Sequence, residues 1–460
     1  MTAQTDRQEP FRFYFNAKTR RATATARING QRSEAACFPA GTHGAAKPFP
    51  KRCFTSLRER TPLKLPKPDE RAPLLSARAK TKMARSPHAY VRGSTVKFYE
   101  WLTSTAASTL PEGPPIWICG DCHVGNLGPV ANAKGEIDIQ IRDLDQTVIG
   151  NPAHDLVRLA LSLASAARGS NLPGVTTARM MEQITEGYLA EFAPEQAAAG
   201  AGAEAPQVVS AALKTAVKRD WKKLARERIQ DTCPEIPLGK KFWPLSKEER
   251  NCLVELVGSG SIHHLITSLH SRSSGAQLEL VDAAYWVKGC SSLGLLRYAL
   301  LVSVDDGAGR SYSLIDVKEA IKAAAPRAPG AKMPKQNGDR VVEGARRLSP
   351  FLGERMVAST VLDHAVFARE LLPEDLKLEI ETLDRDEAVV AARFLAGVVG
   401  KAHARQLGSD DRKAWAGELS KHRARNLDAP SWLWSSVVDL MSTHEAAYLE
   451  HCRRYAEIAA

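Results

Sequence analysis

The sequence predicts an α+β protein in which a mostly helical part accompanies a small antiparallel sheet. Residues 153–169 (AHDLVRLALSLASAARG) repeat apolar side chains at helical spacing, which indicates an amphipathic helix packed on a core. Residues 136–146 (EIDIQIRDLDQ) alternate strictly, which places Ile137, Ile139 and Ile141 on one face of a strand. Residues 283–320 contain three strand-like runs separated by glycine-containing turns, which favours an antiparallel sheet.

The remaining elements follow from the same patterns along the chain. Residues 1–60 show no sustained period, which predicts a poorly ordered arm. Residues 70–108 become helical in pattern, and residues 153–169 begin a helix directly after an Asn-Pro pair that ends the strand region. A second helical region covers residues 175–230, and residues 339–460 are predominantly helical in pattern.

The composition is that of a globular protein. The chain has 460 residues, of which 44% are hydrophobic and 25% charged, so a fibrous or wholly disordered protein is excluded. Residues 1–100 hold 21 basic and 7 acidic side chains, a net charge of +14, whereas residues 101–460 hold 42 and 45, a net charge of −3. A slightly acidic body gives little support to binding of a phosphate backbone. Nucleic acid is therefore not expected as a partner, except through the basic arm.

Cysteine usage and hydropathy predict a cytoplasmic protein that does not enter the membrane. The 8 cysteines are scattered and do not form the dense framework of a small secreted domain. The first ten residues lack the apolar core of a signal peptide. No stretch reaches the ~18 uninterrupted apolar residues that a membrane span requires.

Polar residues that suit phosphoryl transfer gather between residues 119 and 155. Asp121 and Asn126 flank a glycine, and Asp143 follows on the far side of a short strand hairpin. Phosphoryl transfer needs an acidic group to orient or deprotonate the attacking hydroxyl, and an amide and a carboxylate to hold Mg²⁺ against nucleotide phosphates. Asp145 is open to two interpretations, a second metal ligand or a strand residue that faces solvent.

Three strings in this segment resemble the motif series of aminoglycoside-phosphotransferase-like kinases: GDCHVGN, IRDLDQT and GNPAHDLVRLA. The resemblance implies that Asp121 is the catalytic base and that Asn126 and Asp143 bind Mg²⁺. It also implies that Asp155 is a structural carboxylate that supports the catalytic loop. His123 falls on the histidine of the first motif and is the second candidate catalytic residue. ATP and Mg²⁺ are the cofactors that this resemblance implies.

A longer resemblance is to the bacterial domain-of-unknown-function family numbered twenty-two fifty-two, which is placed with the protein-kinase-like folds. It implies a two-lobed fold with a mostly helical large lobe and a small lobe built on an antiparallel sheet. The blocks that carry it extend over most of the chain: KMARSPHAYVRGS (82–94), ICGDCHVGNLG (118–128), DLDQTVIGNPAHDLVRLALSL (143–163), LIDVKEA (314–320), GDRVVEGARR (338–347) and GKAHARQ (400–406).

Kinases also need a flexible glycine turn over the phosphates and a strand lysine that a helical glutamate fixes. Gly289 and Gly294 lie between two strand-like runs, and Lys318 ends a third run, SLIDVK. Glu343, on the helical pattern that follows, is the candidate partner of Lys318. The alternative is that the glycines are there only because the backbone turns at these positions, and that the lysine is a solvated side chain at the end of a strand. Arg92 is a candidate anion contact or loop support, or one half of a surface ion pair.

The order of these segments predicts a circular permutation of the two lobes. In ordinary kinases the glycine turn and the lysine precede the catalytic loop, whereas here they follow it by well over a hundred residues. We therefore expect a helical lobe segment with the catalytic-loop motif over residues 61–282 and a small strand lobe over 283–345. Residues 346–460 would complete the large lobe.

One rival interpretation concerns the string Cys119-Gly120-Asp121-Cys122-His123, which has the C-x-x-C-H spacing of c-type haem attachment. Covalent haem attachment normally requires export, and no signal peptide is expected here. The same cysteine pair could be a redox dithiol or half of a zinc site, but no second pair has metal-ligand spacing. Neither alternative is favoured.

The sequence therefore predicts an ATP- and Mg²⁺-dependent phosphotransferase. The acceptor that fits this chemistry is an unidentified small molecule with a hydroxyl or amine group. The alternative from another class is a catalytically inactive kinase-like protein that binds nucleotide or a partner without phosphoryl transfer.

Overall fold

The computed structural model divides the chain into two units, Met1–Pro62 and Leu63–Ala460. In the first unit it describes the backbone of one antiparallel sheet, formed by β1 (Arg12–Asn16), β2 (Arg21–Ile28) and β3 (Gln31–Glu34). In the second unit it describes residues 65–104, 110–193, 206, 209–210, 235–269, 272–290, 292–307, 309–371, 384–421 and 430–455. The arm predicted over residues 1–60 otherwise lies outside the described residues and stays a prediction.

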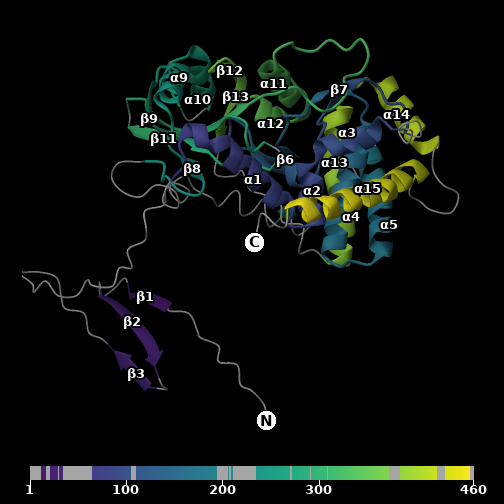
Figure 1. The fold of residues 1–460 in the computed structure, drawn as a ribbon, viewed down its shortest axis with the longest axis horizontal. Helices are drawn as coiled ribbons and strands as arrows, with labels where there is room; N and C mark the ends of the chain where they lie inside the picture. The colour runs from purple at the N-terminus through teal and green to yellow at the C-terminus, as the bar shows by residue number, and fades with distance from the viewer. Residues whose placement is uncertain are drawn as a thin grey trace, which may run out of the picture. The chain divides into compact units, whose positions relative to one another are not determined.

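A six-stranded antiparallel sheet forms one part of the second unit (Figure 1). The strand order is β12-β13-β11-β10-β9-β8. The strands are β8 (Phe242–Trp243), β9 (Gln277–Trp286), β10 (Arg297–Asp305), β11 (Arg310–Glu319), β12 (Met356–Val361) and β13 (His364–Leu371). The hairpins β9-β10 and β10-β11 are those that the pattern of residues 283–320 predicts.

The two faces of this sheet have different surroundings. Leu300 and Ile315 on one face form an apolar core with α9 (Lys247–Val257) and α10 (Gly260–Thr267). Side chains two residues apart in a strand share a face, and neighbours in sequence point to opposite faces. Lys318 therefore lies on the face opposite to Ile315, away from α9 and α10.

The helical part is built around α4 (Ala153–Gly169), whose side chains are buried nearly all round. It has this character because α2, α5, α13 and α15 all pack against it (Figure 1). The helices of this part are α1 (Arg71–Met83), α2 (Pro87–Gly93), α3 (Thr95–Leu102), α5 (Gly174–Ala190), α13 (Arg385–Ala404), α14 (Ser409–Lys421) and α15 (Ser431–Tyr455).

Two small antiparallel sheets connect the helical part to the large sheet. One pairs β4 (Ile116–Ile118) with β7 (Val148–Gly150), and the other pairs β5 (Leu127–Ala131) with β6 (Ile137–Ile141). Helix α11 (Asn337–Leu348) contacts β4 as well as β12 and β13, and the one-turn helix α12 (Pro350–Gly353) follows it. The segments around β4 and β6 therefore lie where the two parts of the unit meet.

The α+β prediction is confirmed. The alternating stretch at 136–146 forms a strand only over Ile137–Ile141, and the helix predicted over residues 153–169 is present as Ala153–Gly169. The large sheet has six strands rather than three, because β8, β12 and β13 join it. Of these, β12 and β13 lie in the stretch 339–460, for which the sequence predicts mostly helix. None of the helices that the structure describes is long and apolar enough to cross a membrane.

Candidate active site

Lys318 lies at the centre of the candidate site. It extends from β11 toward the small sheets and is only 4% exposed. Its Nζ lies 3.3 Å from Asp143 Oδ1, and it also forms an ion pair with Asp145. Lys318 and Asp143 are 175 positions apart in the chain. The fold thus brings together the strand lysine and the acidic segment that the sequence analysis singled out.

Asp143 and Asp145 occupy the segment between β6 and β7, and they differ in electrostatic surroundings. Burial raises the pKa of Asp143, but the Lys318 ammonium group, a hydrogen bond with Asp145 and the guanidinium groups of Arg369 and Arg297 together outweigh burial and hold that pKa below its usual range. Burial and the neighbouring Asp143 carboxylate raise the pKa of Asp145. Among the described residues, Asp145 Oδ1 is buried without a hydrogen-bond partner. This oxygen is a position at which a cation would be stabilised.

The loop that carries Asp121 begins at the end of β4 and depends on Gly120. The φ angle of Gly120 is 74°, and a Cβ there would collide with the carbonyl oxygen of Gln146. Asp155, at the start of α4, accepts hydrogen bonds from the backbone N–H groups of Cys119 over 2.7 Å and Gly120 over 2.9 Å. These are the contacts of a carboxylate that supports the loop, the role that the resemblance implies for Asp155.

The Asp121 carboxylate accepts a hydrogen bond on each oxygen. Thr95 Oγ1 donates to Oδ2 and Arg158 Nε donates to Oδ1, both over 2.9 Å. Arg158 is fully buried, and its Nη2 also donates to the carbonyl oxygen of Val91 over 2.8 Å. Neither Thr95 nor Arg158 was predicted from the sequence. The signal for Arg158 is a charged side chain within an apolar helix, three residues after Asp155.

Asn126 connects the Asp121 loop to the Asp143 segment. Its Nδ2 donates to the carbonyl oxygen of Asp121 over 3.0 Å, which leaves the amide oxygen for another partner. The backbone N–H of Arg142 donates to the carbonyl oxygen of Asn126 over 2.7 Å. Because Arg142 immediately precedes Asp143, the Asn126 amide and the Asp143 carboxylate are held on neighbouring backbone segments.

His123 is buried beside Asp121, with its Nε2 4.0 Å from Asp121 Oδ2. That separation is too long for a hydrogen bond. Burial lowers the pKa of His123 to about 4, so the imidazole is neutral at pH 7. The fold therefore brings His123 to Asp121, but it does not join the two by a hydrogen bond.

The glycine turn between β9 and β10 reaches back to the first helices. Gly289 and Gly294 have φ angles of 97° and 107°, in the region that favours glycine. Lys82 Nζ of α1 donates to the carbonyl oxygen of Gly289 over 2.7 Å. A Cβ on Gly93, at the end of α2, would lie 3.1 Å from Cys290 Sγ. The turn is therefore fixed against the helices that precede the Asp121 loop.

Arg92 lies between this glycine turn and the Asp121 loop. A Cβ on Gly125 would lie 2.7 Å from Arg92 Nη2, so the guanidinium group packs directly on that glycine of the loop. Its positive charge contributes to the lowered pKa of His123, after burial and the opposing effect of Asp121. Arg92 forms no ion pair within the described part of the chain, and its Nε is buried there without a partner. Of the three roles predicted for Arg92, support of the loop is the one for which the structure shows a contact.

The structure does not bring Glu343 to Lys318. Glu343 lies on α11 and forms an ion pair with Arg347 of the same helix over 2.9 Å. The side chain of α11 that faces the site is Arg340, one turn earlier, which donates to the carbonyl oxygen of Asp145 over 3.0 Å. Lys318 is therefore fixed by carboxylates of the loop segment, and α11 contributes a cation where the sequence predicts an anion.

The cysteine pair of the C-x-x-C-H string is part of the core. Cys119 and Cys122 are 0% and 1% exposed, and both are free thiols. A hydrogen bond with Cys122 and burial raise the pKa of Cys119 well above its usual value. In the described residues, no group of three or more His, Cys, Asp or Glu side chains is placed to hold a metal ion. These observations give the haem and zinc alternatives no support.

The arrangement suits a hard cation held against an anionic ligand. Asp143, Asp145 and the Asn126 amide offer oxygen atoms, which Mg²⁺ prefers. Lys318 adds a compact positive charge beside them. Asp121 lies on the far side of Asn126 with its carboxylate held in one orientation. Such a set of groups can hold a divalent cation, a phosphate and a hydrogen-bond donor in one place.

Comparison with known protein families gives one match. A family model described as "Uncharacterized protein conserved in bacteria (DUF2252)" matches residues 71–454. This range includes every residue of the candidate site. No curated protein and no solved structure matches the chain.

Proposed function

The chain belongs to the DUF2252 family of proteins conserved in bacteria, and from this premise we propose that it is an ATP- and Mg²⁺-dependent phosphotransferase. The observation that carries the proposal is the ion pair between Lys318 and Asp143. The motif series predicts Asp143 as a magnesium ligand and the strand-like run SLIDVK predicts Lys318 as the phosphate-binding lysine, although the two residues lie in widely separated segments of the chain. In phosphoryl transfer a lysine contacts the nucleotide phosphates directly and an aspartate contacts them through Mg²⁺, so the two side chains must lie close together.

The fold that accompanies this function is, in our proposal, a circularly permuted protein-kinase-like fold. The large sheet with Lys318 would be the small lobe, and the helices around α4 would be the large lobe. The strands β9 to β11 follow the Asp121 loop in the chain, whereas their counterparts in ordinary kinases precede it. The contact of Gly289 with Lys82 supports the permutation, because it holds the glycine turn against the helices before that loop.

Asn126 and Asp143 would be the magnesium ligands, with Asp145 as a further oxygen donor. The fit rests on the buried, unpartnered Oδ1 of Asp145 and on the amide oxygen that the Nδ2 contact of Asn126 leaves available. When bound, Mg–ATP would supply the γ-phosphoryl group together with a cation that neutralises its charge. The Lys318 ammonium group would then lie beside the phosphates.

Asp121 would orient the acceptor. Its carboxylate can accept a hydrogen bond from the hydroxyl or amine of a small molecule. It would take that proton as the acceptor atom bonds to the γ-phosphorus and the bond from this phosphorus to the oxygen that leaves with ADP breaks. Thr95 and Arg158 keep the carboxylate in one orientation. Positioning of this kind is most of what a protein contributes to phosphoryl transfer.

We also propose a cytoplasmic location. A reducing compartment keeps cysteine side chains as thiols. Within the described residues, the cysteines are all free: Cys119, Cys122, Cys252, Cys290 and Cys452. Their state is consistent with such a compartment.

ATP turnover by the full chain tests the proposed activity. With Mg²⁺ present and water as the acceptor, we expect slow hydrolysis, and Asp143→Asn should reduce it by about tenfold or more because a metal ligand is weakened. Asp138→Asn is the matched control, because Asp138 lies on β6 and pairs with Lys401 over 3.7 Å, outside the site. If Asp143→Asn hydrolyses ATP as fast as the wild type does, the metal assignment is wrong.

One observation favours a second candidate, a module that binds nucleotide without transferring phosphate. Both oxygens of Asp121 already accept hydrogen bonds from Thr95 and Arg158, as those of a structural aspartate do. Such a module would show a higher unfolding temperature with Mg–ATP but no turnover. Turnover that Asp121→Asn abolishes would exclude this candidate.

A further inference from the structure

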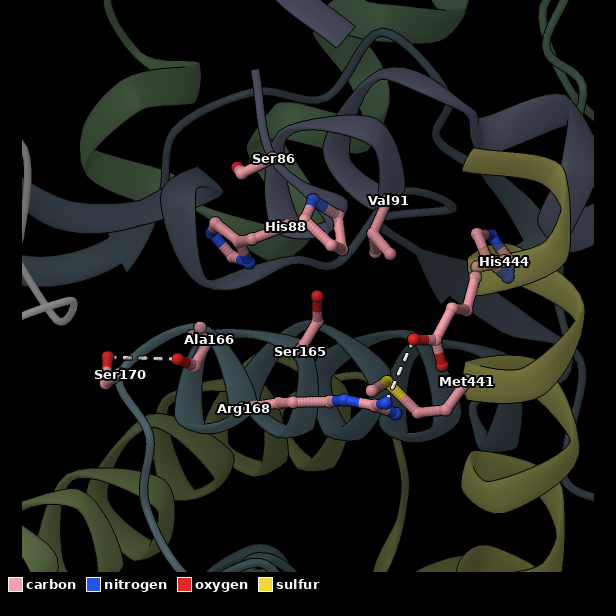
Figure 2. A pocket seen from close by; sticks show the side chains of 12 residues that line it. Ser86, His88, Val91, Ser165, Ala166, Arg168, Ser170, Met441 and His444 are labelled. Carbon is pink, nitrogen blue, oxygen red and sulfur yellow. Dashed lines mark hydrogen bonds and ion pairs between the residues drawn. The ribbon is translucent and has the colours of Figure 1, made fainter. Parts of the chain in front are cut away.

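A pocket of about 390 Å³ lies between α2, α4 and α15, separate from the candidate active site (Figure 2). This volume is within the range of small-molecule sites in proteins. Pro87, Val91, Ala166 and Met441 make much of its wall apolar. Such walls hold ordered water weakly, because a buried water needs several polar partners.

Ser165 supplies the first polar group in this pocket. It lies on α4, is 2% exposed, and its hydroxyl points from the helix into the pocket (Figure 2). In the part of the chain that the structure describes, Ser165 Oγ has no hydrogen-bond partner. A buried hydroxyl without a partner costs free energy, so its position is explained if a ligand satisfies it.

His444 of α15 supplies the second polar group, and its hydrogen-bond role is defined. Nδ1 lies 2.9 Å from the carbonyl oxygen of Leu440, which can only accept, so Nδ1 carries the hydrogen. Burial lowers the pKa of His444 to about 4, so the ring is neutral at pH 7. Nε2 is then an acceptor, and it has no partner among the described residues. A ligand that fits must therefore donate a hydrogen bond to it.

The charged residues of the pocket neutralise each other. Arg168 of α4 and Glu445 of α15 form an ion pair over 2.9 Å (Figure 2). His88 also lines the pocket, and burial lowers its pKa to about 4, so this ring adds no charge at pH 7. No unbalanced charge in the pocket calls for an ionic ligand.

We propose that this pocket binds a small uncharged molecule with an apolar body and a hydroxyl group. The hydroxyl would donate to His444 Nε2 and accept from Ser165 Oγ, while the apolar body packs against Met441. The proposal is independent of phosphoryl transfer. The pocket nevertheless adjoins the candidate active site, because Val91 lines it and accepts the hydrogen bond of the Arg158 side chain that holds Asp121.

Methyl NMR of the full chain, with thymol as the probe, tests this site. Thymol is an uncharged phenol with an apolar ring. The chain has 7 methionines, which can be labelled at their methyl carbons, and Met441→Leu identifies the signal of Met441. We expect thymol to shift the Met441 signal saturably, with one molecule bound per chain. Thymol methyl ether, which cannot donate a hydrogen bond, should bind more weakly.

Variants of the two polar groups provide the controls. Ser165→Leu fills the pocket and should abolish the shift, whereas His444→Phe keeps a ring but removes the acceptor and should weaken binding about three- to tenfold. Ser435→Ala, an exposed serine of α15, should bind thymol as the wild type does. The proposal is overturned if thymol leaves Met441 unshifted up to its solubility limit. It is also overturned if Ser165→Leu and His444→Phe, shown to be folded by their unchanged Met180 signal, bind as the wild type does.

Discussion

At the scale of single residues, Gly120 determines how the chain turns from β4 into the Asp121 loop. Its positive φ and the nearby Gln146 carbonyl oxygen leave no space for a side chain. The Asp155 carboxylate accepts hydrogen bonds from the backbone N–H groups of Gly120 and the preceding Cys119. The position of Asp121 therefore depends on a glycine and on a carboxylate from a different element.

We expect Gly120→Ala to lower the free energy of unfolding by about 3 kcal/mol or more. A left-handed conformation alone costs an alanine about 1–2 kcal/mol, and the collision with Gln146 adds to it. Gly135→Ala is the control, because Gly135 has a φ of 83° but no atom within 4 Å of the new Cβ. Urea unfolding of both variants measures the difference, and equal losses would contradict the steric explanation.

The sequence identified the site residues whose spacing is local, and it identified Lys318 from the strand-like run that this residue ends. It missed Thr95 and Arg158, whose role arises from long-range packing. Asp121, Asn126 and Asp143 lie within one short segment, so a motif describes them. The contact of Arg158 with Asp121 spans 37 positions, and nothing in the local pattern of α4 indicates which loop it binds. The predicted partner Glu343 fails to reach Lys318 because α11 directs it toward its own arginines.

At the scale of elements, the hairpin β12-β13 shows why part of the large sheet was not predicted. Its two-residue turn is Leu362-Asp363, with φ angles of 52° and 62°. Turns with two positive φ angles usually carry Asn-Gly or Asp-Gly, which is the strongest short-range hairpin signal. A leucine at this turn conceals the hairpin, whereas the strict alternation of residues 136–146 predicted the strand that the structure shows as β6.

Helix α11 is attached to the site through Arg340. Its guanidinium donates to the carbonyl oxygens of Asp145 over 3.0 Å, Ile321 over 2.9 Å and Thr147. Arg340 thus joins the helix to the segment that carries Asp145 and to the chain that follows β11. It takes the place in the fold where the sequence predicts a glutamate that fixes the lysine.

We expect Arg340→Met to reduce the free energy of unfolding by about 2–4 kcal/mol, because one buried and two partly buried carbonyl groups lose their donor. Arg347→Met, on the same helix, should cost less than about 1 kcal/mol, since its side chain is 59% exposed and its ion pair lies at the surface. Chemical denaturation of the two variants tests this contrast. A loss for Arg347→Met as large as for Arg340→Met would argue against the role of Arg340.

At the scale of the whole molecule, two properties can be traced to particular residues: the net charge of the chain and the burial of its histidine side chains. The net charge of +11 arises in the first hundred residues, which include the segment with Arg92 and Thr95, whereas residues 101–460 carry a net charge of −3. Inside the second unit, burial lowers the pKa values of His88, His123, His154 and His444 to about 4. These rings are neutral in the folded chain at pH 5, whereas exposed histidines of an unfolded chain are mostly protonated there.

Stability should therefore fall as the pH decreases from about 6.5 to about 4, because the unfolded chain binds more protons in that range. Each buried histidine contributes a loss of about 2 kcal/mol between pH 7 and pH 5. His154→Gln should reduce the difference in the free energy of unfolding between these two pH values by about that amount. The exposed His264 is the control, and His264→Gln should change the difference less. The same pH dependence in wild type and His154→Gln would be inconsistent with a buried neutral ring.

The central claim, that Asp143, Asn126 and Lys318 form one nucleotide site, is tested most directly by a crystal structure of the full chain with Mg²⁺ and a non-hydrolysable ATP analogue. We predict a cation about 2.1 Å from oxygens of Asp143 and Asn126, with the terminal phosphates beside Lys318 Nζ. The Lys318–Asp143 ion pair would give way to contacts with the phosphates and the metal. A nucleotide bound elsewhere on the chain, or one bound while no cation touches Asp143, would contradict the claim.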